Sequence, residues 1–139
     1  MHKVFVFGTL KRGFPNHDEG MAGLTCLGFY RTVQAYPLVI AGRWFSPVMM
    51  PEPGTGHRVT GELYEADDAA LKRLDLIESV HLPTGYHREK IEVVSLDGGL
   101  PANAWVYFKD RARIECTHSA YLTEYNDDRY IHKSKRPAA

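Results

Sequence analysis

A carboxylate at the end of a predicted helix is the side chain whose type and position best suit it to chemistry. The sequence from Asp68 to about Ile77 is typical of a helix. Leu71, Leu74 and Glu78 occupy positions i, i+3 and i+7, so Glu78 projects from the same face as the two leucines, toward the interior or a cavity. A carboxyl group shielded from water has a raised pKa, which suits proton transfer near neutral pH.

A structural role for this carboxylate is the alternative. Glu78 can cap a loop or form an ion pair with Arg88 or His81, because structural ion pairs perturb carboxyl groups as active sites do. Asp75, four residues after Leu71, can share the inward face, whereas the basic residues between them should point to solvent. The spacing alone leaves both interpretations of Glu78 open.

A turn after the first ordered segment is the second candidate. The apolar run Val4–Phe7 leads directly into Gly8, Thr9 and Leu10 and then into a basic pair. Such a run bounded by glycine is typical of a central strand, and glycine lets the following backbone turn sharply and approach a ligand. Successive N–H groups in a turn of this kind can bind an anion. The alternative for Gly8 is a plain tight turn. Lys11 and Arg12 are expected to be a solvated pair rather than an anion clamp.

Other kinds of site receive little support. The seven histidines show no i, i+4 pair and no Cys-X-X-Cys partner, so we predict no metal site. The turn at Gly8 lacks the later glycines of a phosphate loop or a dinucleotide fingerprint. Thr9 has no base beside it in the sequence, and Cys26 and Cys116 are expected to be buried, inert thiols.

The composition predicts one compact domain with a small partner. The chain has 139 residues, 44% of them hydrophobic, which is enough for one sizeable core. Seventeen basic and seventeen acidic residues cancel, so nothing indicates binding to nucleic acid or to an anionic membrane. Without a secretory signal or a disulfide framework, a cytoplasmic protein with free thiols is expected. The apolar runs are far shorter than the roughly 20 residues that span a bilayer.

The elements that must position these residues are mostly short strands. A short helix is expected from Asn16, its N-cap, to about Met21, and Asp67 is expected to cap the helix that carries Glu78. Residues 97–99 predict a hairpin, and 113–125 show no clear period. We expect one domain over residues 1–132 and a flexible basic tail over 133–139. The strands after the first are expected at Thr25–Thr32, Tyr36–Ile40, Phe45–Met50, Val59–Tyr64, Tyr86–Ser95 and Ala102–Tyr107.

Several motifs together resemble a known family. They are Phe7–Gly13, Pro15–His17, Tyr36–Gly42, Gly61–Tyr64 and Leu74–Glu78, in this order along the chain. They resemble the gamma-glutamylcyclotransferase-like (AIG2-like) family, most closely its gamma-glutamylamine cyclotransferase branch. The resemblance extends from about residue 4 to residue 107, and the C-terminal part matches only loosely.

The resemblance implies a fold and a set of site residues. The fold is α+β: a small mixed barrel of parallel and antiparallel strands with short flanking helices and an active cavity at the end of the first strand. Glu78 is implied as the catalytic acid and base. The implied substrate-binding residues are Phe7, Gly8, Thr9 and Leu10, with Tyr107 as a wall of the pocket.

The resemblance also implies a reaction. A gamma-glutamyl amide, for example gamma-glutamyl-epsilon-lysine, is converted to 5-oxoproline and a free amine by attack of its own alpha-amino group. No metal, nucleotide or redox cofactor is needed, and the partner is a small gamma-glutamyl compound. The family usually has tyrosine where this chain has Phe7, so a non-catalytic module that binds a gamma-glutamyl ligand is an alternative. A cyclotransferase for another gamma-glutamyl compound is a further one, and the oligomeric state stays open.

Overall fold

The structure is a computed structural model that describes residues 1–137; residues 138 and 139 lie outside the description. Five strands close into a barrel in the order β1-β5-β2-β6-β7, and two form a separate sheet, β3-β4. The strands are β1 (His2–Val6), β2 (Thr25–Thr32), β3 (Leu38–Ala41), β4 (Ser46–Met49), β5 (Thr60–Ala66), β6 (His87–Ser95) and β7 (Ala102–Phe108). The helices are α1 (His17–Met21), α2 (Asp68–Ile77) and two 3₁₀ turns, Arg111–Arg113 and Lys133–Lys135.

β1 makes the barrel a mixed one. It pairs antiparallel with β5, where Val4 lies opposite Tyr64, and parallel with β7, where Val4 lies opposite Trp105. The other barrel pairs are antiparallel. The fold class expected from the sequence, an α+β fold with a small mixed barrel and short flanking helices, is therefore confirmed.

The apolar run of β1 serves two cores at once. Phe5 belongs to the cluster that fills the barrel, whereas Val4 and Val6 belong to a second cluster with Leu71 and Leu74 of α2. Because successive residues of a strand point to opposite faces, a strand buried on both faces needs apolar side chains at every position. The uninterrupted run at the start of the chain is thus a requirement of the barrel.

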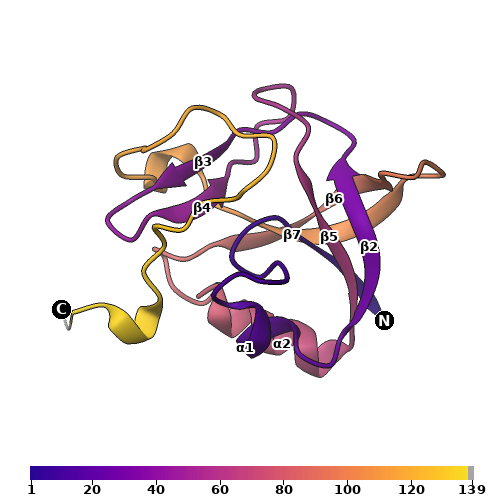
Figure 1. Cartoon of the computed structure of the whole chain (residues 1–139), viewed down its shortest axis with the longest axis horizontal. Coiled ribbons are helices and arrows are strands. Elements are labelled where there is room, and N and C mark those ends of the chain that lie inside the picture. The colour runs from indigo at the N-terminus through magenta and orange to yellow at the C-terminus, as the bar shows by residue number, and fades with distance from the viewer. Residues whose placement is uncertain (138–139) are drawn as a thin grey trace.

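α2 has the bounds and the cap that the sequence predicts. Asp67 accepts a hydrogen bond from the Ala70 backbone N–H at 2.8 Å, as an N-cap residue should. α1 packs beside α2 below the barrel, and Arg73 of α2 donates to the Gly20 carbonyl of α1 at 2.9 Å (Figure 1). Asn16 stands at the N-cap position of α1, but its side chain makes no capping hydrogen bond.

Two predictions about single side chains are wrong. Lys11 is buried rather than solvated, because the tight turn closed by its N–H on the Gly8 carbonyl brings its Nζ to the Tyr125 carbonyl at 2.7 Å. Cys26 and Cys116 are both free and exposed, because the first part of β2 has little cover and Cys116 lies in a loop.

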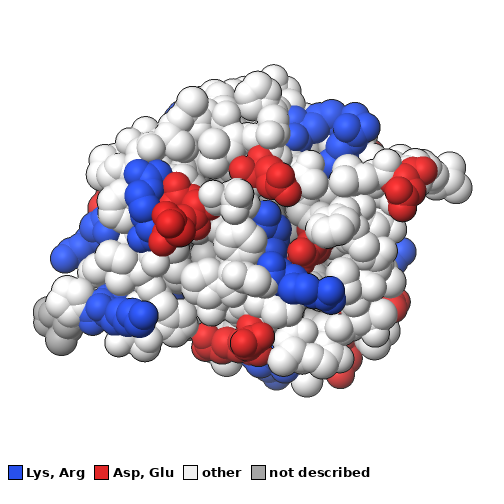
Figure 2. All heavy atoms as spheres, viewed as in Figure 1, with Lys and Arg blue, Asp and Glu red and all other residues white. Residues whose placement is uncertain are grey.

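The molecular surface carries mixed charges. On the face seen in Figure 2, basic side chains are separated by acidic and uncharged ones, and no continuous basic area forms. Among residues 1–137, no helix has the length and apolar character needed to cross a membrane.

Candidate active site

A cavity at the end of β1 brings the candidate site residues together. Its volume is about 340 Å³, and it is bounded by the turn after β1, the end of α2, the end of β7 and the C-terminal segment. Every site residue expected from the sequence lines this cavity: Phe7, Gly8, Thr9, Leu10, Glu78 and Tyr107. The structure therefore places both parts of the predicted site around one space, and their roles stay predictions.

Glu78 sits at the point where the chain leaves α2. It is the C-cap residue, and its N–H still donates to the Leu74 carbonyl at 2.9 Å, which keeps it on the face of Leu71 and Leu74. The next residue, Ser79, has a φ of 55°, and the loop returns so that the Tyr86 N–H donates to the Glu78 carbonyl at 3.0 Å. Bonds on both sides of the residue thus fix the direction of its side chain.

The environment of Glu78 gives its carboxyl group a pKa of about 7. Loss of hydration raises the pKa, and the positive charges of Lys133 and Lys109 lower it only in part. The side chain keeps some exposed surface because it faces the cavity, yet the surrounding chain separates it from bulk solvent. A carboxyl group with a pKa of about 7 can both accept and donate a proton at neutral pH.

The structure contains neither of the ion pairs considered for Glu78 among its described residues. Arg88 pairs with Asp75 instead, with two bonds at 2.9 and 3.1 Å, and His81 is exposed. Within residues 1–137 the Glu78 carboxyl group has no hydrogen-bond partner and no salt bridge. It is therefore free to bond a molecule in the cavity.

Asp75 holds Tyr107 at the wall of the cavity. The Tyr107 hydroxyl donates to Asp75 Oδ1 at 2.7 Å, and the Arg88 guanidinium lies over the ring of Trp105 with its Cζ 4.1 Å from the ring centroid. Burial, and then this bond to Asp75, raise the pKa of Tyr107 well above its ordinary value. Tyr107 is thus a fixed neutral donor directed at Asp75, and it contributes shape to the cavity.

The turn after β1 lines the cavity, and three of its backbone N–H groups bond no described residue. The Gly8 and Thr9 carbonyls accept bonds from the N–H groups of Lys11 and Asn16 at 3.0 and 2.9 Å, which fix the turn. Within residues 1–137 the N–H groups of Gly8, Thr9 and Leu10 have no acceptor, although all three residues are buried. Backbone N–H groups in native proteins usually have a partner, so three free ones in buried residues that line a cavity make this turn a candidate ligand site.

Gly8 is needed in this turn for a reason that the sequence did not predict. A Cβ atom here would lie 2.6 Å from Cγ of the buried Pro47 in β4. The missing side chain thus lets the turn pack against β4, rather than giving a ligand room or permitting a positive φ.

The side chains of Thr9 and Phe7 are held by a hydrogen bond and by core packing, respectively. The Thr9 hydroxyl accepts from Asn16 Nδ2 at 2.9 Å, and this amide also donates to the Tyr130 hydroxyl at 3.2 Å. Thr9 thus has an amide, not a base, beside it. The Phe7 ring is 6% exposed and packs in the barrel core, so it lines the cavity as an apolar wall.

Sequence reasoning missed the cations of the cavity and two further tyrosines, Tyr86 and Tyr130. Lys109 and Arg113 follow β7, Lys133 and Arg136 come from the C-terminal segment, and Arg43 lies between β3 and β4; all five line the cavity. The Tyr86 hydroxyl donates to the Pro47 carbonyl at 2.9 Å, and burial raises its pKa well above the ordinary value. The basic residues near the C-terminus were a signal, but nothing in the sequence places them beside Glu78.

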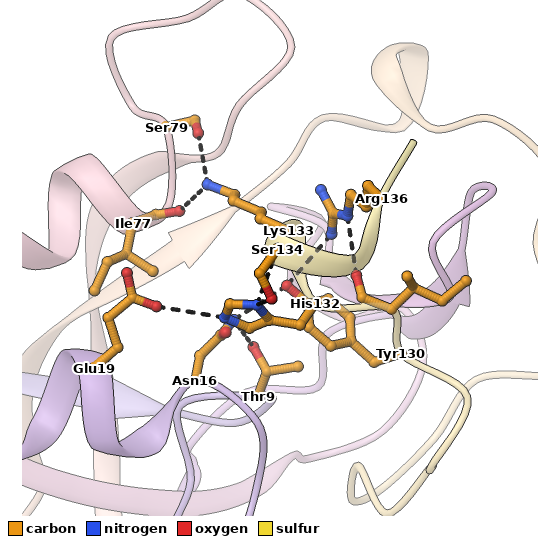
Figure 3. A network of polar contacts seen from close by, with 11 residues as sticks. Thr9, Asn16, Glu19, Ile77, Ser79, Tyr130, His132, Lys133, Ser134 and Arg136 are labelled. Atoms are coloured by element: carbon orange, nitrogen blue, oxygen red, sulfur yellow. Dashed lines mark hydrogen bonds and ion pairs between the residues drawn. The ribbon is translucent and has the colours of Figure 1, made fainter. Parts of the chain in front are cut away.

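The C-terminal segment contributes Tyr130, Lys133 and Arg136 to the lining of the cavity, and Figure 3 shows the polar contacts that hold the segment in place. Lys133 Nζ donates to the Ile77 carbonyl at 2.7 Å and to Ser79 Oγ at 3.2 Å, the residues on either side of Glu78. Arg136 donates to the Tyr130 hydroxyl at 3.3 Å. The expected flexible tail at 133–139 thus begins inside the site; its mobility stays a prediction, and residues 138 and 139 lie outside the described residues.

The chain is similar to several known proteins. A family model described as "Gamma-glutamyl cyclotransferase, AIG2-like" matches residues 4–130. The chain is 40% identical over 127 residues to the gamma-glutamylaminecyclotransferase of Bos taurus, covering 88% of this chain and 74% of that protein. It is 42% identical over 107 residues to the Homo sapiens protein of that name, covering 73% and 67%. The crystal structure of an AIG2-like protein from Mus musculus superimposes with a TM-score of 0.83 at 33% identity, covering 98% and 99%.

The fold and the cavity place the chain in a class of proteins with a small closed barrel and a pocket of the size that small molecules occupy. The match over residues 4–130 makes the assignment specific: the chain belongs to the AIG2-like gamma-glutamyl cyclotransferase family. Among the described residues, no three His, Cys, Asp or Glu side chains gather as a metal site would require.

Proposed function

We propose that this protein is a gamma-glutamylamine cyclotransferase, which converts a gamma-glutamyl amide to 5-oxoproline and a free amine. The observation that carries the proposal is Glu78, a carboxyl group with a pKa of about 7 that lines the same cavity as a turn whose backbone N–H groups bond no described residue. The relatives named gamma-glutamylaminecyclotransferase support the amine branch of the family.

The first task of the site is to hold the substrate curled. Attacker and target are parts of one molecule, and a well-oriented intramolecular attack can reach an effective molarity on the order of 10⁵ M. The free N–H groups of Gly8, Thr9 and Leu10 bind either the alpha-carboxylate or the oxyanion that develops on the gamma-carbonyl. Phe7 and Tyr107 supply walls that limit the conformations of the bound chain.

The second task is proton transfer. Glu78 accepts a proton from the alpha-ammonium group, which frees the nitrogen lone pair for attack on the gamma-carbonyl carbon. The nitrogen–carbon bond of the five-membered ring forms, the bond to the departing amine breaks, and the ring nitrogen gives up a second proton, so that the amine leaves as its ammonium ion. The same carboxyl group delivers a proton to the departing nitrogen, because an unprotonated amide nitrogen leaves poorly. Every step uses the chain and the substrate alone.

A non-catalytic binding module is the second candidate, and the ring of Phe7 favours it because no hydroxyl stands at that position. The free N–H groups of the turn do not depend on this side chain, so turnover remains the first proposal. We further propose that the protein works in the reducing cytoplasm, which its two exposed free cysteines support.

The experiment is incubation with gamma-glutamyl-epsilon-lysine and a panel of gamma-glutamyl peptides, with 5-oxoproline as the measured product. Release of 5-oxoproline from the amide by the wild type, and none by Glu78→Gln, is the expected result. Binding of the amide without any product would support the module instead. Product from gamma-glutamyl peptides alone would move the assignment to another gamma-glutamyl substrate.

A further inference from the structure

Tyr86 is bonded to two parts of the cavity wall. It follows the loop that leaves Glu78, and its backbone N–H donates to the Glu78 carbonyl at 3.0 Å. Its hydroxyl donates to the Pro47 carbonyl of β4 at 2.9 Å. All three residues line the cavity. One residue therefore joins the end of α2, which carries Glu78, to the strand against which the turn after β1 packs.

The loop between Glu78 and Tyr86 is tightly closed. The Leu82 N–H donates to the Ser79 carbonyl at 2.9 Å, and the Gly85 N–H donates to the Leu82 carbonyl at 3.1 Å. A Cβ atom at Gly85 would overlap the Ser79 carbonyl oxygen, so the two ends of the loop lie in contact. The position of Tyr86 thus fixes the position of the Glu78 backbone.

Pro47 connects Tyr86 to the turn after β1. The backbone of Gly8 packs so closely on Pro47 that an added Cβ atom would lie 2.6 Å from its Cγ. Pro47 is buried in β4 and paired with Ile40 of β3, so the carbonyl that accepts the Tyr86 hydroxyl belongs to a fixed strand. Gly8, Pro47, Tyr86 and Glu78 therefore form a continuous series of contacts along the wall of the cavity.

The Tyr86 hydroxyl is a fixed donor rather than a proton carrier. The ring packs against the apolar clusters of α2 and of the β3-β4 sheet, and Lys109 Nζ lies 4.4 Å from its centroid. Burial, and then the charge of Glu78, raise the pKa of Tyr86 well above its ordinary value, so the hydroxyl stays protonated. Its one proton is used on the Pro47 carbonyl. Tyr86 therefore acts on proton transfer through the position of Glu78.

We infer that Tyr86 is a positioning residue that sets the distance between Glu78 and the turn at residues 8–10 through its hydrogen bond to Pro47. This role rests on the proposed function, because it concerns the proton transfer of that same site. Intramolecular attack requires closely defined geometry, and a misplacement of about 1 Å can lower a rate by about 10²-fold. A residue bonded to both parts of the wall is suited to prevent such a shift.

Tyr86→Phe tests this role because it removes the hydroxyl and keeps the ring. With gamma-glutamyl-epsilon-lysine (the lysine amide) as substrate, kcat should fall by about tenfold, while KM stays close to that of the wild type because the turn still binds the glutamyl group. Tyr30→Phe is the matched control: it removes the same atom from a half-buried tyrosine of β2 outside the cavity and should keep kcat. Urea unfolding checks that both variants are folded.

The pKa of Glu78 provides a second measurement that needs no turnover. The charges of Lys133 and Lys109 act on Glu78, the tyrosines near it, Tyr86 and Tyr107, are neutral, and Tyr86→Phe changes none of these charges. Without the hydroxyl, the Glu78 carboxyl group can move toward water, so its pKa should fall from about 7 toward 4.5. A carbon-13 NMR titration measures this pKa, and the signal is identified by its absence in Glu78→Gln.

The two measurements separate this role from the proposed function. If the wild type releases no 5-oxoproline, the proposed function is wrong and the titration alone decides: a lower pKa of Glu78 in Tyr86→Phe supports the role, and an unchanged pKa overturns it. If the wild type is active, a lower kcat together with a lower pKa supports the role. An unchanged kcat, an effect on KM alone, an unchanged pKa, or an equal loss in Tyr30→Phe would overturn it.

Discussion

Two segments far apart in the sequence line the same cavity and are held there by different forces. The turn at residues 7–10 is buried and continues β1, whose side chains belong to both cores. The C-terminal segment at 130–136 contains no fully buried residue and is held by polar contacts, such as those of Lys133 with the Ile77 carbonyl and of Arg136 with the Tyr130 hydroxyl. The turn depends on packing, and the segment depends on hydrogen bonds.

This difference separates two demands on one site. Chemistry requires fixed groups, and a turn anchored in the barrel core cannot shift without disturbing the fold. Binding of the substrate does not require the C-terminal segment to be held as firmly. The exposed hydrogen bonds that hold it contribute about 1 kcal/mol each and can open locally. Changes near the turn and Glu78 should therefore have large effects, and changes in the C-terminal segment small ones.

The largest effect is expected at Glu78. Glu78→Gln keeps the shape of the side chain but cannot relay a proton, so kcat should fall by about 10³-fold, within the usual range for a general acid and base. The rate of 5-oxoproline release measures this effect. Glu115→Gln, an exposed carboxylate on the same cavity, is the matched control and should change kcat little. Equal losses in both variants would refute the special role of Glu78.

The next effect is expected in the turn. Gly8→Ala places a methyl group 2.6 Å from Pro47 Cγ, so the turn must shift, and we expect the free energy of unfolding to fall by about 2 kcal/mol and KM to rise. Denaturant unfolding and steady-state kinetics measure the two changes. Pro47→Ala makes room, so the double variant should recover part of both losses. Additive losses in the double variant would contradict the packing argument.

The raised pKa of Glu78 predicts a pH-dependent stability. The pKa is about 7 in the folded protein against an ordinary value of 4.5, so ionisation is harder when folded. Stability from this group is fully present below pH 4.5 and is lost as the pH rises through 7. Glu78→Gln stays neutral, so relative to wild type its free energy of unfolding should rise by about 2 kcal/mol between these pH values.

Urea unfolding of both proteins at several pH values measures this difference. The acidic limb of kcat/KM for the wild type should also lie near pH 7, where Glu78 ionises. A difference in stability that does not change with pH would show that the Glu78 carboxyl group titrates normally.

The smallest effect is expected in the C-terminal segment. Tyr130→Phe removes the hydroxyl that joins Asn16 to Arg136, and the free energy of unfolding should fall by no more than about 1 kcal/mol. KM for the lysine amide should rise a few-fold while kcat is largely kept. Thermal unfolding and kinetics provide the measurements. A loss as large as that of Gly8→Ala would mean that both segments are held equally firmly.

Local patterns explain why some features could be predicted. The apolar run in β1 could be predicted as a buried strand because its alternate side chains are buried on opposite faces. The N-cap at Asp67 and the spacing of the leucines predicted α2 and the inward direction of Glu78. The first strand, the turn after it and the direction of Glu78 thus follow from local patterns, whereas the barrel was predicted from the family resemblance. Lys11 was wrongly predicted to be solvated, because its burial depends on a contact with Tyr125, more than a hundred residues away.

The sequence by itself determined the strands, the capped helix and the family, because these depend on residues close together in the chain or on motifs in a fixed order. The tertiary structure alone decided which cations surround Glu78, why Gly8 must lack a side chain, and that Arg88 belongs to Asp75. Each of these depends on contacts between distant segments. No local pattern encodes such contacts, and only closure of the barrel brings them about.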